Sequence, residues 1–128
     1  MDVAPKGSGS RDRLRVLFVC SLNQWRSPTA EALYRSDPRL EVRSAGIRSN
    51  ARRRIGAADL KWANVVFVME VDHRRWIQER FGGLGLPPIR VLEVSNTLGF
   101  MDNELQRVLR LAIDPEIDAL TGPGGPPA

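Results

Sequence analysis

Hydrophobic residues in this chain gather in short runs that predict four β-strands. The runs LRVLFVC at 14–20 and NVVFVME at 64–70 are almost continuously apolar, which is typical of parallel strands buried on both faces. The segment LEVRSAG at 40–46 alternates polar and apolar positions and ends at a glycine, and PIRVLEV at 88–94 is a further apolar-rich segment. Both of these segments also predict strands.

A helix is predicted after the first strand. Pro28 suits the first position of a helix, with Ser27 before it as the N-cap. This helix is expected to end near Asp37-Pro38, because the residue before a proline disfavours helical geometry. A second, short helix is predicted at 55–63.

Two more helices are predicted in the second half of the chain. The segment 71–81 is followed by Gly82-Gly83, a pair that ends helices. From Leu105 onward, apolar residues recur at spacings of 3, 4, 7 and 8, so an amphipathic helix is expected at 103–113. Asp114-Pro115 is expected to start a separate terminal turn.

Strands that alternate with helices favour an α/β fold, with a parallel sheet covered by helices on both faces. The length of 128 residues suits one domain. We place this domain at 13–120. The flanking segments 1–12 and 121–128 are rich in Gly, Ser and Pro and are expected to be flexible tails. In parallel sheets, ligands bind beyond the carboxyl ends of the strands, and Cys20 lies at such an end.

Composition narrows the class of protein. Hydrophobic residues make up 42% of the chain, but no apolar run reaches the roughly 18 residues of a membrane helix. The first residues lack the apolar segment of a signal peptide, so we expect a cytoplasmic protein. One cysteine and one histidine exclude an internal disulfide and a metal site built from several thiolates or imidazoles. Residues 1–64 carry a net charge of +7 and residues 65–128 one of −3, which suits an anionic ligand near Cys20.

The loop after the first strand, CSLNQWRSP, combines groups that make a nucleophile and bind phosphate. A free thiol is mostly protonated at neutral pH. The amides of residues 21–27, the start of the next helix, the Arg26 charge and the Ser27 hydroxyl all favour the thiolate of Cys20. The same groups can hold a phosphate dianion. On the residues alone, an inert buried thiol remains the alternative for Cys20.

The string VLFVC..N..RSPTAEAL, followed by RSAGI and by ADLKWANVVFVME, resembles the low-molecular-weight protein tyrosine phosphatase family. It is most similar to a short bacterial branch of that family. The resemblance covers roughly residues 14–113. It implies a flavodoxin-like fold with a four-stranded parallel sheet in the order 2-1-3-4, a cytoplasmic location, and no metal or cofactor.

The resemblance also implies a reaction and roles for single residues. Cys20 would attack phosphorus and form a phosphocysteine, and water would then hydrolyse this intermediate. Arg26 and the loop amides would stabilise the transition state, Ser27 would assist departure of the sulfur, and Asn23 would brace the loop. The residues implied to bind phosphate are Ser21, Leu22, Asn23, Gln24, Trp25 and Arg26. The implied partners are a phosphorylated protein or a small aryl phosphate, with phosphate or sulfate as ligands of the loop.

Three departures from the family pattern stand out. Leu22 replaces a glycine, so the loop is expected to curl differently. Trp25 replaces a second cysteine; it can stack on an aromatic substrate or pack on the rim of the site. The general-acid aspartate is missing, because its place, Ser95–Leu98, reads SNTL. Asp102 is the tentative substitute acid, although it also suits the N-cap of the last helix. Loss of a general acid costs about 10²–10⁴-fold, so weak activity is expected.

Other functions stay open at this point. The missing aspartate suits a catalytically impaired relative that binds phosphorylated ligands. Arsenate reduction coupled to thioredoxin would need further cysteines, and nucleic-acid binding is suggested only by the basic charge. His73 and the run Arg52–Arg54 are expected at the surface, and the larger aromatic side chains Trp62, Trp76 and Phe81 in the core.

Overall fold

The computed structural model describes residues 13–122. The segments that we predicted as tails lie outside these residues, apart from Thr121 and Gly122. Thr121 is the last residue of a long helix, which therefore runs one residue past the domain end that we predicted at residue 120.

Four parallel strands form one sheet in the order β2-β1-β3-β4. The strands are β1 (Leu14–Cys20), β2 (Leu40–Gly46), β3 (Val65–Val68) and β4 (Ile89–Val91). This arrangement confirms the predicted α/β class and the predicted strand order. β4 is shorter than expected because Glu93 adopts a left-handed backbone conformation, with φ of 59°, that ends the strand.

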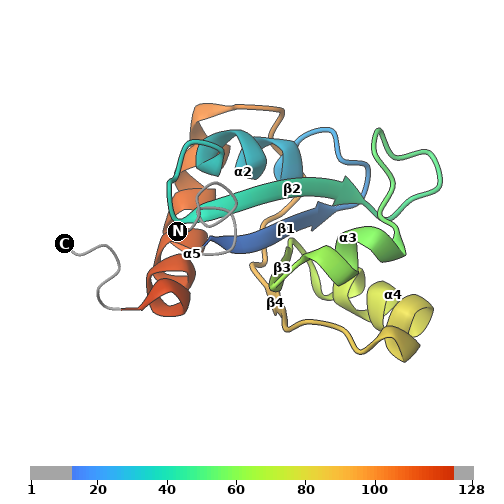
Figure 1. Cartoon of the computed structure of the whole chain (residues 1–128). Helices are drawn as coiled ribbons and strands as arrows, with labels where there is room; N and C mark the ends of the chain where they lie inside the picture. The colour runs from blue at the N-terminus through green and yellow to red at the C-terminus, as the bar shows by residue number, and fades with distance from the viewer. Residues whose placement is uncertain (1–12, 123–128) are drawn as a thin grey trace.

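Helices cover both faces of the sheet (Figure 1). On one face lie α2 (Arg26–Tyr34) and α5 (Asn103–Thr121). On the other lie α3 (Ala57–Trp62) and α4 (Val71–Phe81), and a short 3-10 turn, Gly82–Leu84, follows α4. None of the described helices has the length and apolar content that crossing a membrane requires.

The alternation of side chains along β1 divides the core between the two faces. Val16, Phe18 and Cys20 pack on the side of α2 and α5, whereas Leu17 and Val19 pack on the side of α3 and α4. Successive side chains of a strand point to opposite faces, so a strand covered on both faces needs an unbroken apolar run. Cys20 thereby ends β1 on the α2 side of the sheet. Three aromatic residues were expected in the core: Trp62, Trp76 and Phe81. They are partly buried, and they pack against the apolar cluster on the α3 and α4 side of the sheet.

The start of α2 differs from the prediction. The helix begins at Arg26, with Trp25 at the N-cap, and Pro28 lies inside its first turn. The N–H of Thr29 already bonds to the carbonyl of Trp25 at 3.0 Å, so the helical turn closes before Ser27 can act as a cap. The Ser27 hydroxyl does not cap the helix and instead forms hydrogen bonds within the loop before α2.

α5 continues through Pro115, where we expected a break. Proline lacks the N–H that would bond to the carbonyl of Leu111. The Leu111 side chain is 65% exposed, so this face of the helix is open to water. On the opposite face, Ile113 and Ile117 are fully buried. Because Ile113 and Ile117 are buried on either side of the proline, packing against the core stabilises one continuous helix.

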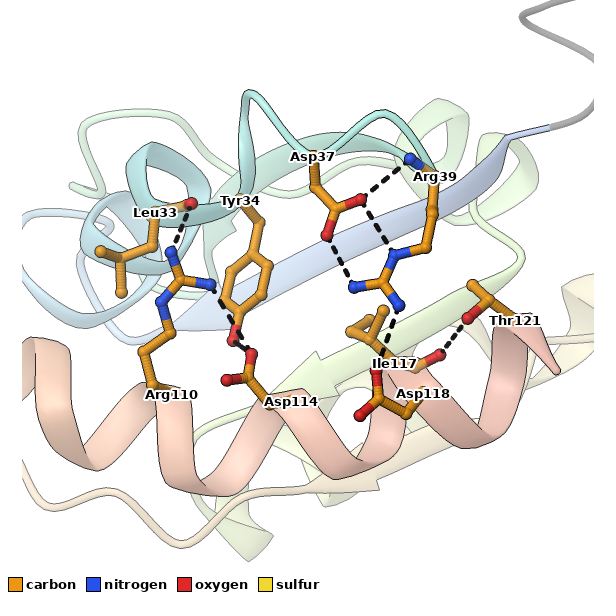
Figure 2. A network of polar contacts seen from close by, with 9 residues as sticks. All are labelled: Leu33, Tyr34, Asp37, Arg39, Arg110, Asp114, Ile117, Asp118 and Thr121. Atoms are coloured by element: carbon orange, nitrogen blue, oxygen red, sulfur yellow. Dashed lines mark hydrogen bonds and ion pairs between the residues drawn. The ribbon is translucent and has the colours of Figure 1, made fainter. Parts of the chain in front are cut away.

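Polar contacts also hold α5 against the end of α2 (Figure 2). The Tyr34 hydroxyl donates to Asp114, and the Arg110 guanidinium lies over the Tyr34 ring, 4.5 Å from its centroid. Burial, followed by the contact with Asp114, raises the pKa of Tyr34. The phenol therefore remains a hydrogen-bond donor at neutral pH.

A second link in Figure 2 joins the loop after α2 to the end of α5. Arg39 forms ion pairs with Asp37 at 2.8 Å and with Asp118 at 3.1 Å. The hydrogen bonds from Arg39 lower the pKa of Asp37. Together the two links hold α2 and the loop after it against α5, which matters because the N-terminal end of α2 carries the candidate site.

Candidate active site

The segment 20–26 joins β1 to α2 at the carboxyl end of the sheet. It turns at Asn23, which is fully buried and has φ of 56°. Asparagine tolerates this left-handed conformation better than most residues. Leu22, at the position of the expected glycine, does not have a positive φ. The left-handed turn of this loop is therefore made by Asn23, one residue after the position of the expected glycine.

The carbonyl groups of this loop face a second loop, residues 47–52. The N–H groups of Ile47, Arg48 and Arg52 donate to the carbonyls of Cys20, Ser21 and Leu22 at 3.1, 3.0 and 2.9 Å. Nε of Arg52 donates to the carbonyl of Asn23 at 2.9 Å. A trans peptide carries its N–H opposite its C=O, and the described chain contains no cis peptide. The N–H groups of residues 21–24 thus point to the inner side of the loop.

The buried Asn23 side chain ties the loop to its surroundings. Its Nδ2 donates to the hydroxyls of Ser27 and Ser44, both at 2.9 Å. Ser44 lies on β2 and donates in turn to Glu31 of α2 at 2.5 Å. The Asn23 amide thus links the loop to a strand and a helix, and these contacts support the turn at Asn23.

Cys20 and Ser27 form a close pair at the base of the loop. Sγ of Cys20 lies 3.0 Å from the Ser27 hydroxyl and accepts the Ser27 N–H at 3.4 Å. Cys20 is 3% exposed. The Ser27 oxygen accepts from Asn23, and its one proton can go either to the sulfur or to the Ala45 carbonyl, 3.3 Å away. A negatively charged sulfur attracts this proton more strongly than a carbonyl does, so the Ser27 N–H and hydroxyl suit a thiolate, both as a nucleophile and as a leaving group.

Arg26 is buried beside this pair, with 1% of its surface exposed. Its Nη1 donates to the Glu70 carboxylate at 2.5 Å and to the Val94 carbonyl at 2.7 Å. Its Nε is buried and has no hydrogen-bond partner among the described residues. A buried, unsatisfied donor on a charged group is costly. An anion held in the loop would satisfy it.

A small pocket of about 70 Å³ opens over this loop. It is lined by Cys20, Ser21, Leu22, Gln24, Trp25, Arg26 and Asn96. No carboxylate is among these lining residues. Trp25 lines this pocket and is 42% exposed, which leaves part of the residue open to a ligand.

Gly46 ends β2 where that strand meets the loop. A Cβ atom at this position would lie 2.7 Å from the carbonyl oxygen of Ser21 and 2.9 Å from the nitrogen of Asn23. Both are backbone atoms of the loop and cannot yield as a flexible side chain would. This close approach explains why the SAG segment ends in glycine.

We expect Gly46→Ala to displace the loop and to lower the free energy of unfolding by about 1–3 kcal/mol, a typical effect of overpacking. Urea unfolding and binding of inorganic phosphate would measure the two effects. Gly83→Ala is the matched control, because a Cβ atom there meets nothing within 4 Å. Equal behaviour of the two variants would contradict this account of Gly46.

The structure separates Asp102 from the pocket. Asp102 is the N-cap of α5 and accepts the N–H groups of Glu104 and Leu105 at 2.8 and 3.3 Å. The segment where the sequence lacks an acid contributes Asn96 to the pocket instead. The sequence pointed to this segment but not to the residue within it that faces the pocket.

Two residues at the start of α4 were missed from the sequence. His73 was expected at the surface but is 2% exposed, and its Nε2 lies 3.0 Å from the Ser21 hydroxyl. Glu70 forms the ion pair with Arg26, whose hydrogen bond lowers the pKa of Glu70. Glu70 is therefore ionised at neutral pH and cannot act as a proton donor. No local sequence signal marks either residue, since both contacts depend on how α4 packs.

The arginine run has divided roles. Arg52 braces the loop, as described above. Arg53 forms an ion pair with Asp59 at 2.7 Å and donates to the Ser44 carbonyl at 2.7 Å. Arg54 instead lines a separate open groove beside Ser21 and His73. Arg52, Arg53 and Arg54 are all exposed, as expected, but the contacts of Arg52 and Arg53 also hold the second loop in place.

Solved structures with a similar fold include several phosphatases. The low-molecular-weight protein tyrosine phosphatase SP-PTP of Streptococcus pyogenes superposes with a TM-score of 0.68 at 16% identity, covering 85% of this chain and 94% of that one. The arginine phosphatase YwlE of Geobacillus stearothermophilus gives 0.59 at 26% identity, covering 84% and 96%. The tyrosine phosphatase Wzb of Escherichia coli K30, solved in complex with phosphate, gives 0.65 at 17% identity, covering 83% and 97%.

No protein-family model matches the sequence, and no curated protein matches it significantly. The structural likeness spans most of this chain and nearly all of each neighbour. The chain thus has the fold of low-molecular-weight protein tyrosine phosphatases, and the resemblance noted in the sequence is confirmed at the level of the fold.

Proposed function

We propose that the protein is a cysteine-dependent phosphatase that acts on aryl phosphates, either phosphotyrosine in proteins or small aryl phosphates. One observation carries the proposal: the buried Arg26 leaves its Nε without a partner beside the Cys20–Ser27 pair. The phosphatase fold and the inward N–H groups of the loop support it.

In the first step, a phosphate dianion would occupy the loop. The N–H groups of residues 21–24 and Nε of Arg26 would bind its oxygens. The thiolate of Cys20 would attack phosphorus in line with the leaving oxygen, forming the S–P bond while the P–O bond breaks. Because the donors are fixed before the reaction, they stabilise the charge of the transition state without reorganisation.

In the second step, water would attack the phosphocysteine and release inorganic phosphate. The S–P bond breaks, and the sulfur leaves as a thiolate. The Ser27 hydroxyl, 3.0 Å from Sγ, would donate to the departing sulfur and so make it a better leaving group. Arg26 would stabilise the transferring phosphoryl group in both steps.

The pocket favours substrates whose leaving group needs no proton. No lining residue is a carboxylic acid, and Glu70 is ionised. A phenol, with a pKa of about 10, leaves as an anion far more readily than an aliphatic alcohol or the strongly basic guanidine of phosphoarginine. We therefore expect turnover in the order activated aryl phosphate, phosphotyrosine, then phosphoserine and phosphoarginine.

Turnover of p-nitrophenyl phosphate tests the proposal, with Cys20→Ser as the blank. We expect turnover by the wild type, competitive inhibition by phosphate, and a phosphorylated Cys20 peptide after acid quenching. The expected preference for activated aryl phosphates would appear as a steep dependence of kcat/KM on the acidity of the leaving group. Equal, negligible rates in wild type and Cys20→Ser would reject the enzyme.

The alternative is a binding protein for phosphorylated ligands, which the absence of an acid among the pocket-lining residues favours. Such a protein would bind phosphate in the same loop without turnover. Protection of both wild type and Cys20→Ser against heat by phosphate, combined with negligible rates in both, would support this alternative.

A further inference from the structure

We propose that His73 is a positioning residue of the loop 20–26. Its imidazole donates a hydrogen bond that holds Ser21, the residue next to the nucleophile. This inference deepens the proposed function and rests on it. His73 lies in the first turn of α4 and is 2% exposed, yet neither chemical step proposed above uses it.

Its hydrogen bonds define which ring nitrogen carries the proton. The N–H of Glu70 donates to Nδ1 of His73 at 3.1 Å. A backbone N–H can only donate, so Nδ1 is the acceptor and the neutral ring carries its proton on Nε2. This N–H faces the Ser21 hydroxyl at 3.0 Å. The imidazole is therefore a donor to Ser21.

The ring is neutral under ordinary conditions. Burial, and secondarily the Arg26 charge, lower the pKa of His73 to about 4. The acidic groups Glu70 and Asp72 act in the opposite direction, and Arg48 adds to the lowering. At neutral pH the ring can thus accept at one nitrogen and donate at the other, as both contacts require.

Ser21 is held from two sides by these contacts. Its carbonyl accepts the N–H of Arg48 at 3.0 Å, and its hydroxyl accepts from His73. The peptide between Ser21 and Leu22 carries one of the inward N–H groups of the loop. Fixing both the carbonyl and the side chain of Ser21 therefore fixes the direction in which this N–H points.

One turn of α4 thus controls both ends of the loop. Glu70 orients Arg26, at the far end, through its carboxylate. The backbone of the same residue orients His73, which holds Ser21 at the near end. Small rotations of loop donors matter, because misplacement by about 1 Å can cost roughly 10²-fold in rate.

The competing explanation is that His73 only caps α4. A side chain at the third helical position that accepts the N-cap N–H stabilises the helix start. This role uses Nδ1 alone, whereas positioning of Ser21 uses Nε2. The two nitrogens can be separated by substitution: the amide oxygen of asparagine can replace Nδ1, and the longer glutamine can place an amide N–H near Nε2.

We expect His73→Asn to keep the melting temperature near that of wild type and to lower kcat/KM for p-nitrophenyl phosphate by about 10–10²-fold. His73→Gln should lower the melting temperature but retain more activity than His73→Asn. In a Ser21→Ala background, His73→Asn should cause little further loss, because both substitutions remove the same contact. Arg75→Gln, an exposed change on α4, is the control.

Two further readouts separate this inference from the proposed function. Orthovanadate mimics the transition state, so its affinity should fall in step with kcat/KM in His73→Asn. Cys20 is the only cysteine, so alkylation by iodoacetamide reports on it alone and needs no turnover; it should slow in His73→Asn. A wild type without turnover would reject the phosphatase, while slower alkylation in His73→Asn would still support positioning.

The inference is overturned if His73→Asn matches wild type in kcat/KM, vanadate affinity and alkylation rate. It is equally overturned if the effects of His73→Asn and Ser21→Ala multiply in the double variant, because the two residues would then act independently. A drop in melting temperature without these changes would assign His73 to helix capping alone.

Discussion

Replacing Cys20 with serine will abolish turnover and leave phosphate binding largely intact, whereas replacing Arg26 with lysine will impair both. The serine hydroxyl is a poor nucleophile at neutral pH, but it is smaller and less charged than a thiolate, so the loop still accepts an anion. Lysine can donate to Glu70 and Val94 in place of Nη1. It has no second, fixed donor for the phosphate where Nε of Arg26 lies.

For Arg26→Lys we expect kcat/KM to fall by about 10³–10⁵-fold, the range for arginines that stabilise a transferring phosphoryl group. Steady-state kinetics with p-nitrophenyl phosphate and calorimetric titration with phosphate would measure the two effects. Arg107→Lys is the control, since Arg107 forms only an exposed pair with Glu104 on α5. An Arg26→Lys variant with wild-type phosphate affinity would contradict the role given to Nε.

The sheet was predictable because each strand has a local sequence pattern that is typical of strands. Runs such as that of β1 must be apolar on both faces, and glycine at position 46 marks the end of β2. The continuation of α5 through Pro115 was not predictable from local rules. It depends on the burial of Ile113 and Ile117 against the sheet, which overrides the loss of one backbone hydrogen bond.

The site was predictable only where the loop contacts itself. Cys20, Asn23, Arg26 and Ser27 lie within seven positions of each other, and their contacts with one another follow from the turn and the start of α2. His73 is different, because it lies 52 residues from Ser21 in the chain. A histidine among arginines on a polar helix carries no sign that packing will bury it. The sequence also could not foresee that Asn96 faces the pocket, since Glu93 and Met101, both with positive φ, shape that segment.

The position of Asn96 leads to the second prediction: Asn96→Asp should raise activity on poor leaving groups. Asn96 lines the pocket over Cys20, where a protonated carboxyl would reach the leaving oxygen. We expect kcat/KM for a phosphotyrosine peptide to rise by about 10²-fold, within the usual range for general acids. The gain for p-nitrophenyl phosphate should be much smaller, because its leaving group needs little protonation.

The pH dependence gives an independent check of the same variant. An acid must be protonated to act, so the gain of Asn96→Asp should shrink as the pH rises and the new carboxyl ionises. Ser95→Asp is the matched control: it adds the same charge one residue away, at a position that does not line the Cys20 pocket. An equal gain in both variants would indicate a general charge effect. An unchanged rate in Asn96→Asp on phosphotyrosine would mean that residue 96 does not face the leaving group, and that the weak point of this site lies elsewhere in the loop.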